Sequence, residues 1–184
     1  MDPGCEDRGG GRVRVCFHGA ESTGKTMLAK KLATEFDCPL AAEYGRTYAE
    51  TIDTNFRLAD LTAIAARQNR LMREACAGNA PLVLLDTDPL MTAAWAEMLF
   101  GHAPEVLFGY DKAELYLLFE ADVPFVEDGT RFFGSESERA RFAALAEDML
   151  LRAGVRYQRV SGSWEKREET ARAAIHAALA AASS

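Results

Sequence analysis

The sequence has few cysteines, few histidines and no long apolar run. Its four cysteines are widely separated along 184 residues, so their spacing predicts neither a zinc motif nor a disulfide framework. The three histidines follow no partner pattern, and we assign them no chemistry. No segment approaches the roughly 18 apolar residues of a membrane span, and the glycine-rich start at residues 1–11 lacks the apolar core of a secretory signal. We therefore expect a cytoplasmic protein with no membrane partner.

Positive charge is also scarce. The chain holds 21 Lys and Arg residues against 28 Asp and Glu residues, a formal net charge of −7, which argues against a broad nucleic-acid surface. Hydrophobic residues make up 48% and charged residues 27% of the chain, as in ordinary globular proteins. We expect one domain over residues 12–182 behind a flexible tail at residues 1–11. The expected partner is a small-molecule nucleoside substrate and not nucleic acid. Whether the protein forms a homo-oligomer is left open by the sequence.

Short apolar runs alternate with segments of helical periodicity. Two continuous apolar runs, 81–85 and 115–119, are typical of parallel strands covered on both faces. Further strands are expected at 12–18, 39–42 and 155–160, and helices at 27–36, 59–77, 92–100, 138–152 and 165–182. Strands that alternate with helices predict an α/β fold with a parallel sheet.

Residues 19–26, Gly-Ala-Glu-Ser-Thr-Gly-Lys-Thr, fill every fixed position of the Walker A pattern between an expected strand and an expected helix. Gly19 and Gly24 let the backbone turn tightly, so that successive N–H groups can surround a phosphate. The alternative is a glycine-rich turn between strand and helix in which the lysine is simply solvated. Lys25 is expected to reach the β- and γ-phosphates of ATP, and the Thr26 hydroxyl to hold Mg²⁺. The predicted nucleotide-binding set is Gly19, Glu21, Ser22, Thr23, Gly24, Lys25, Thr26, Met27 and Trp164.

Three carboxylates lie near the carboxyl ends of expected strands, at the edge where parallel sheets bind ligands. Asp86 follows the run 81–85 and is expected to hold Mg²⁺ and serve catalysis, with a helix N-cap as the alternative. For Asp88, helix capping and binding of a substrate hydroxyl are equally expected. Glu43 is the expected group that orients or deprotonates the acceptor hydroxyl. Its alternative is a surface ion pair with Arg46.

Residues 122–134 interleave charged side chains with phenylalanines, which predicts a lid that closes over the triphosphate. Arg131 in this segment is expected to stabilise the charge on the transferring phosphoryl group. Tyr44 and Trp95 are more typical of core packing than of stacking on a base. For Trp164, which follows the last expected strand, packing and stacking on adenine are equally expected.

Five motifs occur together in this sequence: residues 19–26, Ala-Glu-Tyr-Gly-Arg at 42–46, Leu-Asp-Thr-Asp-Pro-Leu at 85–90, Trp-Ala-Glu-Met-Leu-Phe-Gly at 95–101 and Asp-Gly-Thr-Arg-Phe-Phe-Gly at 128–134. In their order and spacing they resemble the nicotinamide riboside kinase domain of NadR-type proteins over nearly the whole chain. The resemblance implies a P-loop NTPase fold of the nucleoside- and nucleotide-kinase type, three-layer α/β/α with a five-stranded parallel sheet. It also implies transfer of phosphate from ATP, with Mg²⁺, to the ribose 5′-hydroxyl of nicotinamide riboside, giving nicotinamide mononucleotide for NAD salvage.

The same resemblance implies that Lys25 and Thr26 hold ATP and Mg²⁺, that Glu43 and Arg46 lie at the nucleoside site, that Asp86 and Asp88 flank Mg²⁺ and the ribose, and that Arg131 lies in the lid. Taken together with the residue patterns, the predicted catalytic set is Lys25, Glu43, Asp86 and Arg131, and the metal set is Thr26 and Asp86. The predicted nucleoside-binding set is Glu43, Tyr44, Arg46, Asp88, Trp95 and Asp128. Because the chain begins eighteen residues before its Walker A motif, we expect a free-standing kinase that makes no NAD by itself. The alternatives are a kinase for another nucleoside or nucleotide, and a regulatory NTPase without a small acceptor.

Overall fold

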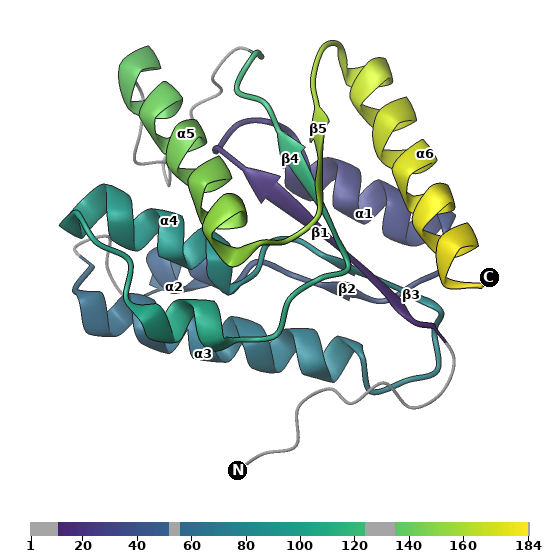
Figure 1. The fold of residues 1–184 in the computed structure, drawn as a ribbon, viewed down its shortest axis with the longest axis horizontal. Helices are drawn as coiled ribbons and strands as arrows, with labels where there is room; N and C mark the ends of the chain where they lie inside the picture. Colours follow the sequence, from purple (N-terminus) through teal and green to yellow (C-terminus); the bar gives the residue numbers. More distant parts are fainter. Residues whose placement is uncertain (1–10, 52–55, 124–134, 184) are drawn as a thin grey trace.

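A computed structural model describes residues 11–51, 56–123 and 135–183 of the protein (Figure 1). Five strands form one sheet: β1 Val13–Gly19, β2 Leu40–Ala41, β3 Leu82–Leu85, β4 Leu115–Phe119 and β5 Tyr157–Val160. They pair in the order β2-β3-β1-β4-β5, and every neighbouring pair is parallel. The predicted five-stranded parallel sheet is confirmed.

Helices cover both faces of this sheet. Their bounds are α1 Lys25–Glu35, α2 Tyr44–Thr51, α3 Leu58–Ala75, α4 Pro89–Phe100, the short 3₁₀ helix η1 Glu105–Gly109, α5 Glu136–Ala153 and α6 Trp164–Ala182. Helices α3, α4 and α5 lie over one face, and α1 and α6 over the other (Figure 1). The fold is therefore the expected three-layer α/β/α arrangement.

Alternate residues of β1 belong to two separate hydrophobic cores. Val15 and Phe17 lie in the core beneath α1 and α6, whereas Cys16 lies in the core beneath α3, α4 and α5. A central strand covered on both faces needs apolar side chains at nearly every position, which explains the continuous apolar runs at 81–85 and 115–119. The sheet is thus a rigid base, and the loops at its carboxyl edge are held by two packed layers.

Helix α4 begins at Pro89, earlier than the predicted residue 92. Asp88 caps it, because its Oδ1 accepts hydrogen bonds from the Leu90 N–H at 3.0 Å and the Met91 N–H at 3.4 Å. Proline is favoured at the first helical position, where its missing N–H has no intrahelical partner to lose. Periodicity alone could not locate this start, since the cap depends on one side-chain contact.

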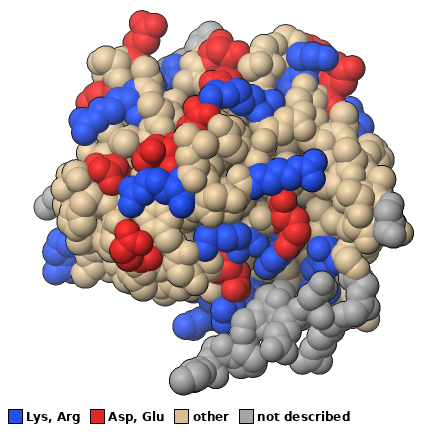
Figure 2. All heavy atoms as spheres, viewed as in Figure 1, with Lys and Arg blue, Asp and Glu red and all other residues tan. Residues whose placement is uncertain are grey.

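The surface carries charges of both signs. Figure 2 shows Lys and Arg side chains interspersed with Asp and Glu side chains over one face, with no single-sign basic field. Several of these groups form ion pairs, including Arg172 with Glu35 at 2.5 Å and Lys31 with Glu168 at 2.6 Å. Within the described ranges, none of the helices combines the length and apolar character that a membrane crossing requires.

Candidate active site

The turn between β1 and α1 borders a cavity of about 370 Å³. Its lining contains all the predicted nucleotide-binding residues except Trp164, namely Gly19, Glu21, Ser22, Thr23, Gly24, Lys25, Thr26 and Met27. Lys25 lines this cavity, and its Nζ donates a hydrogen bond to the Ala20 carbonyl oxygen at 2.6 Å. The loop therefore has the shape and the cation that binding of a triphosphate requires.

Two glycines of this loop permit contacts that no side chain would allow. Gly19 adopts φ 121°, and a Cβ there would lie 2.4 Å from the Phe119 carbonyl oxygen. Gly24 adopts φ 83°, and a Cβ there would lie 2.3 Å from the indole of Trp164. Trp164, the first residue of α6, is 54% exposed. Its ring consequently packs on the start of α1 and still presents surface beside the loop.

The contact between Gly24 and Trp164 gives a first prediction. Gly24→Ala is expected to weaken ATP binding by about tenfold or more, because the added Cβ meets the indole and a left-handed alanine costs about 1–2 kcal/mol. Isothermal titration with ATP measures the effect. Gly78→Ala is the matched control, since a Cβ at Gly78 meets nothing within 4 Å. Equal affinities of the Gly24→Ala variant and the wild type would show that the loop tolerates a side chain there.

Glu43 and Arg46 lie just after β2, where Glu43 precedes α2 and Arg46 belongs to it. Strand β2 pairs with β3 in a register that sets Ala41 beside Leu85, so the residues that follow both strands emerge at one edge of the sheet. The Nε of Arg46 lies 3.6 Å from Glu43 Oε2, and both residues line the large cavity. The ion pair that was the alternative for Glu43 is present, but it borders this cavity.

The charged groups of this edge alter one another's protonation. Burial, together with nearby Asp86, raises the pKa of Glu43 to about 6 against the opposing effects of Lys25 and Arg46. Burial also raises the pKa of Asp86, opposed by a hydrogen bond with the Thr26 hydroxyl. Burial lowers the pKa of Lys25, and the nearby carboxylates of Glu43 and Asp86 raise it in part. Two carboxylates and a lysine therefore form one electrostatic unit at the foot of the loop.

Thr26 and Asp86 fit a magnesium ion. The Thr26 hydroxyl lies near enough to the Asp86 carboxylate to lower the pKa of Asp86, and Asp86 is 2% exposed. Mg²⁺ prefers hard oxygen ligands and retains several waters, so two protein oxygens beside a triphosphate are a suitable set.

A smaller cavity of about 60 Å³ adjoins the first. The two share Glu21, Glu43, Arg46, Met91 and Trp95, and the smaller one is further lined by Gly45, Ala49, Phe56, Leu61, Ile64, Gln68, Thr87 and Thr92. Trp95 lines both cavities and also packs as predicted, with its ring centroid 4.9 Å from that of Phe142; its contact with a base stays a prediction. The apolar and aromatic lining suits a flat ring.

Other predicted site residues lie elsewhere. Asp88 is fully buried and accepts a hydrogen bond from the Tyr116 hydroxyl at 2.5 Å in addition to its cap contacts, so the structure gives it the capping role. Its contact with a substrate hydroxyl stays a prediction. Tyr44 packs beside Tyr48, with ring centroids 6.3 Å apart. Asp128 and Arg131 lie outside the described residues.

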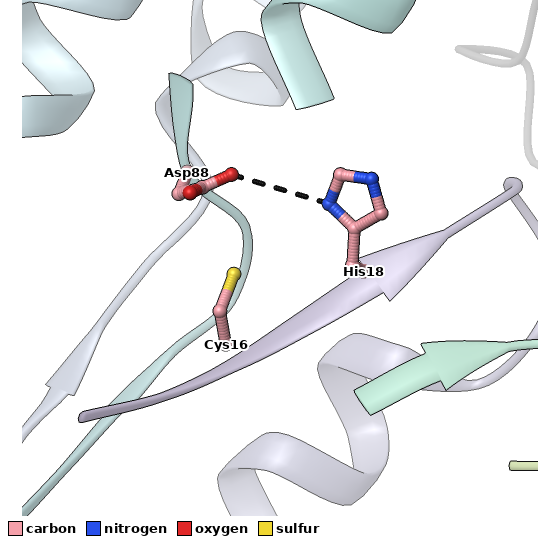
Figure 3. A group of neighbouring side chains, drawn as sticks. All are labelled: Cys16, His18 and Asp88. Carbon is pink, nitrogen blue, oxygen red and sulfur yellow. Dashed lines mark ion pairs between the residues drawn. The ribbon is translucent and has the colours of Figure 1, made fainter. Parts of the chain in front are cut away.

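Three buried side chains, Cys16, His18 and Asp88, lie together, although their sequence spacing did not predict it. Sulfur, nitrogen and oxygen atoms of Cys16, His18 and Asp88 lie within 4.8 Å of one another (Figure 3). His18 Nε2 lies 2.9 Å from the Ala146 carbonyl oxygen, while its Nδ1 is 4.0 Å from Asp88 Oδ1. Burial lowers the pKa of His18 to about 3, so its ring is neutral. Zinc ligands would have to approach within about 3.5 Å of each other, and the 4.0 Å between His18 Nδ1 and Asp88 Oδ1 exceeds this distance.

Comparisons with known proteins agree with this geometry. Residues 14–167 match the protein-family model described as an AAA domain. The chain belongs to the AAA domain family. This AAA domain is also similar to two curated relatives, the trifunctional NAD biosynthesis/regulator protein NadR of Escherichia coli strain K12 and that of Salmonella typhimurium strain LT2. Each is 29% identical over 153 residues, which cover 79% of this chain and 37% of the relative.

Solved structures show the same fold. A crystal structure of NadR protein in complex with NR aligns with a TM-score of 0.75 and 23% identity over 92% of this chain and 52% of that chain. Thymidylate kinase from Ehrlichia chaffeensis aligns with a TM-score of 0.65 and 13% identity over 89% of this chain and 99% of that chain. The resemblance to NadR-type proteins and the P-loop kinase fold are therefore confirmed, and this AAA domain spans just over a third of its curated relatives' length.

Proposed function

We propose that this protein transfers the γ-phosphoryl group of ATP to the ribose 5′-hydroxyl of nicotinamide riboside, giving nicotinamide mononucleotide for NAD salvage in the cytoplasm. The observation that carries the proposal is the position of Glu43. This carboxylate lines both the cavity around the phosphate-binding loop and the apolar cavity beside it. A group that borders both spaces is placed to act between a phosphate donor and an acceptor hydroxyl.

The proposed reaction divides the work among few side chains. Loop N–H groups and Lys25 hold the triphosphate, and Thr26 and Asp86 would hold Mg²⁺, which neutralises phosphate charge when bound. Glu43 orients the 5′-hydroxyl and takes its proton as the new oxygen–phosphorus bond forms and the bond to the β-phosphate oxygen breaks, releasing ADP. Since the transition state is loose, the placement of Glu43 matters more than its basicity. Arg131 in the predicted lid stabilises the transferring charge.

Nicotinamide riboside is the preferred acceptor for two reasons. The relatives are NAD biosynthesis proteins, and one of the solved NadR structures holds NR. The ring of nicotinamide riboside carries a positive charge, and the smaller cavity offers such a ring the aromatic side chains Phe56 and Trp95 and the carboxylate of Glu21. Neutral nucleosides would gain the stacking but not the charge interaction.

A thermal-shift panel tests the acceptor. The protein is heated with a non-hydrolysable ATP analogue and one of several nucleosides, and a ligand at a hundred times its dissociation constant should stabilise it by about 2.7 kcal/mol. Nicotinamide riboside is expected to give the largest shift. A larger shift with a neutral nucleoside would overturn the acceptor and leave the kinase. No shift with any nucleoside would favour a regulatory NTPase.

The protonation of Glu43 predicts a pH dependence. Its pKa is raised to about 6, so the carboxylate form that accepts a proton is lost as the pH falls below this value. We expect kcat/KM for the nucleoside to decrease about tenfold per pH unit on the acid side. The Glu43→Gln variant is the control, because any acid limb caused by ATP itself persists in it. Identical acid limbs in both proteins would remove Glu43 from the proton transfer.

A further inference from the structure

Gln68 is a buried amide of α3 that the proposed mechanism does not use. It is 2% exposed and lines the smaller cavity. A buried carboxamide destabilises a fold unless its polar atoms are hydrogen-bonded. The partners of Gln68 therefore indicate why an amide stands where an apolar residue would pack more simply.

Those partners are backbone groups on both sides of Glu43. The Tyr44 N–H donates to Gln68 Oε1 at 2.8 Å, and Gln68 Nε2 donates to the Ala42 carbonyl at 3.1 Å. Ala42 and Tyr44 are the chain neighbours of Glu43. One side chain thus fixes both peptide groups that determine the direction of the Glu43 side chain, just before α2 begins.

The same amide reaches the loop that carries Asp86. Its Nε2 lies 3.5 Å from the Thr87 carbonyl oxygen. Thr87 adopts φ 91°, a conformation that costs a β-branched residue about 1–3 kcal/mol and persists only where the surroundings hold it. Gln68 therefore contacts both loops from which the two acidic groups emerge, and Asp86 is near enough to Glu43 to raise the pKa of Glu43.

We propose that Gln68 is a positioning residue that holds Glu43 and Asp86 at the separation required between acceptor hydroxyl and phosphate donor. This rests on the proposed function, because the separation matters only if a phosphoryl group is transferred between the two cavities. Gln68 contacts neither reactant in this role. Its effect is on the geometry of the reacting groups, where a displacement of about 1 Å can reduce the rate about a hundredfold.

Gln68→Leu removes all three contacts and replaces the amide with an apolar side chain of similar size. We expect kcat to fall by about tenfold or more with little change in KM for ATP, because Glu43 is no longer fixed. The acid limb of the kcat/KM profile, expected near pH 6 from the pKa of Glu43, should also move, because the distance from Glu43 to Asp86 changes. A residue that only supports the fold would move neither kcat per folded molecule nor this limb.

Asn69→Leu is the matched control. Asn69 is also a buried amide of α3, 5% exposed, but its Oδ1 accepts from the Asp111 N–H at 3.2 Å, away from both acidic loops. The Asn69→Leu variant should lose stability like the Gln68→Leu variant and keep the kcat and pH profile of the wild type.

If Gln68→Leu does not fold, the Gln68→Glu variant provides the test. Glutamate keeps an oxygen that accepts from the Tyr44 N–H but has no amide N–H to donate to the Ala42 and Thr87 carbonyls. A lower kcat is again expected.

The outcomes separate the two claims. A wild-type protein without nucleoside-dependent ADP release contradicts the proposed function itself. An active wild type with unchanged kcat in the Gln68 variant that folds contradicts the positioning role alone. A higher KM for the nucleoside at constant kcat also overturns it, because that result would make Gln68 a direct ligand of the acceptor.

Discussion

Lys25→Ala is expected to abolish phosphoryl transfer, with kcat reduced by about 10³-fold or more. The Lys25 ammonium lies in the wall of the large cavity, bonded at 2.6 Å to a carbonyl of its own loop. It can exchange this contact for phosphate oxygens without a change in the fold. Its charge also opposes the repulsion between Glu43 and Asp86. Loss of the lysine therefore removes a phosphate contact and disturbs the carboxylates opposite.

The measurement is steady-state ADP release together with ATP titration. Lys31→Ala is the control, because Lys31 lies on the same helix, has a side chain 59% exposed and pairs with Glu168. It should retain the activity of the wild type. Wild-type turnover in Lys25→Ala would mean that this loop is not the phosphate site.

Glu43→Gln is expected to reduce kcat by about tenfold or more while ATP affinity stays near that of the wild type. Glutamine keeps the length and hydrogen-bonding capacity of the side chain but cannot take the hydroxyl proton. Because Glu43 lies in the segment between β2 and α2 and not in the phosphate-binding loop itself, the triphosphate contacts remain. The expected signature is a lower kcat at nearly constant ATP binding.

Titration calorimetry with ATP and initial-rate kinetics with the nucleoside separate the two effects. Glu50→Gln is the control, because Glu50 is an exposed glutamate on α2, the helix that follows Glu43, and this variant should behave as the wild type. A loss of ATP affinity as large as the loss of kcat would place Glu43 at the donor and refute its acceptor role.

Local patterns predicted most of the fold. The buried strands and the Walker A motif are continuous in sequence, so they could be recognised without tertiary information. Strand β2 was harder, because only Leu40 and Ala41 pair, and two residues carry almost no periodicity. The start of α4 depended on the Asp88 cap, which one side-chain contact decides.

The candidate site was predicted where residues follow strands, and missed where contacts are long-range. Glu43 and Asp86 meet because parallel strands end at one edge, a rule that the sequence alone supports. Gln68 lies 24 residues from Tyr44 and 19 from Thr87, and no local pattern marks it. Cys16 and His18 are two residues apart on β1, so their side chains point to the same face of the sheet. The sequence shows this spacing, but it does not show that Asp88 lies beside them.

Nucleoside-dependent ADP release by the purified protein is the most direct test of the central claim. Initial rates are measured with ATP and Mg²⁺ alone and then with each of several nucleosides, with the phosphorylated product identified by mass spectrometry. We predict little release without acceptor, a large increase with nicotinamide riboside, and nicotinamide mononucleotide formed in equal amount to ADP. ADP release that no nucleoside stimulates would contradict the kinase assignment.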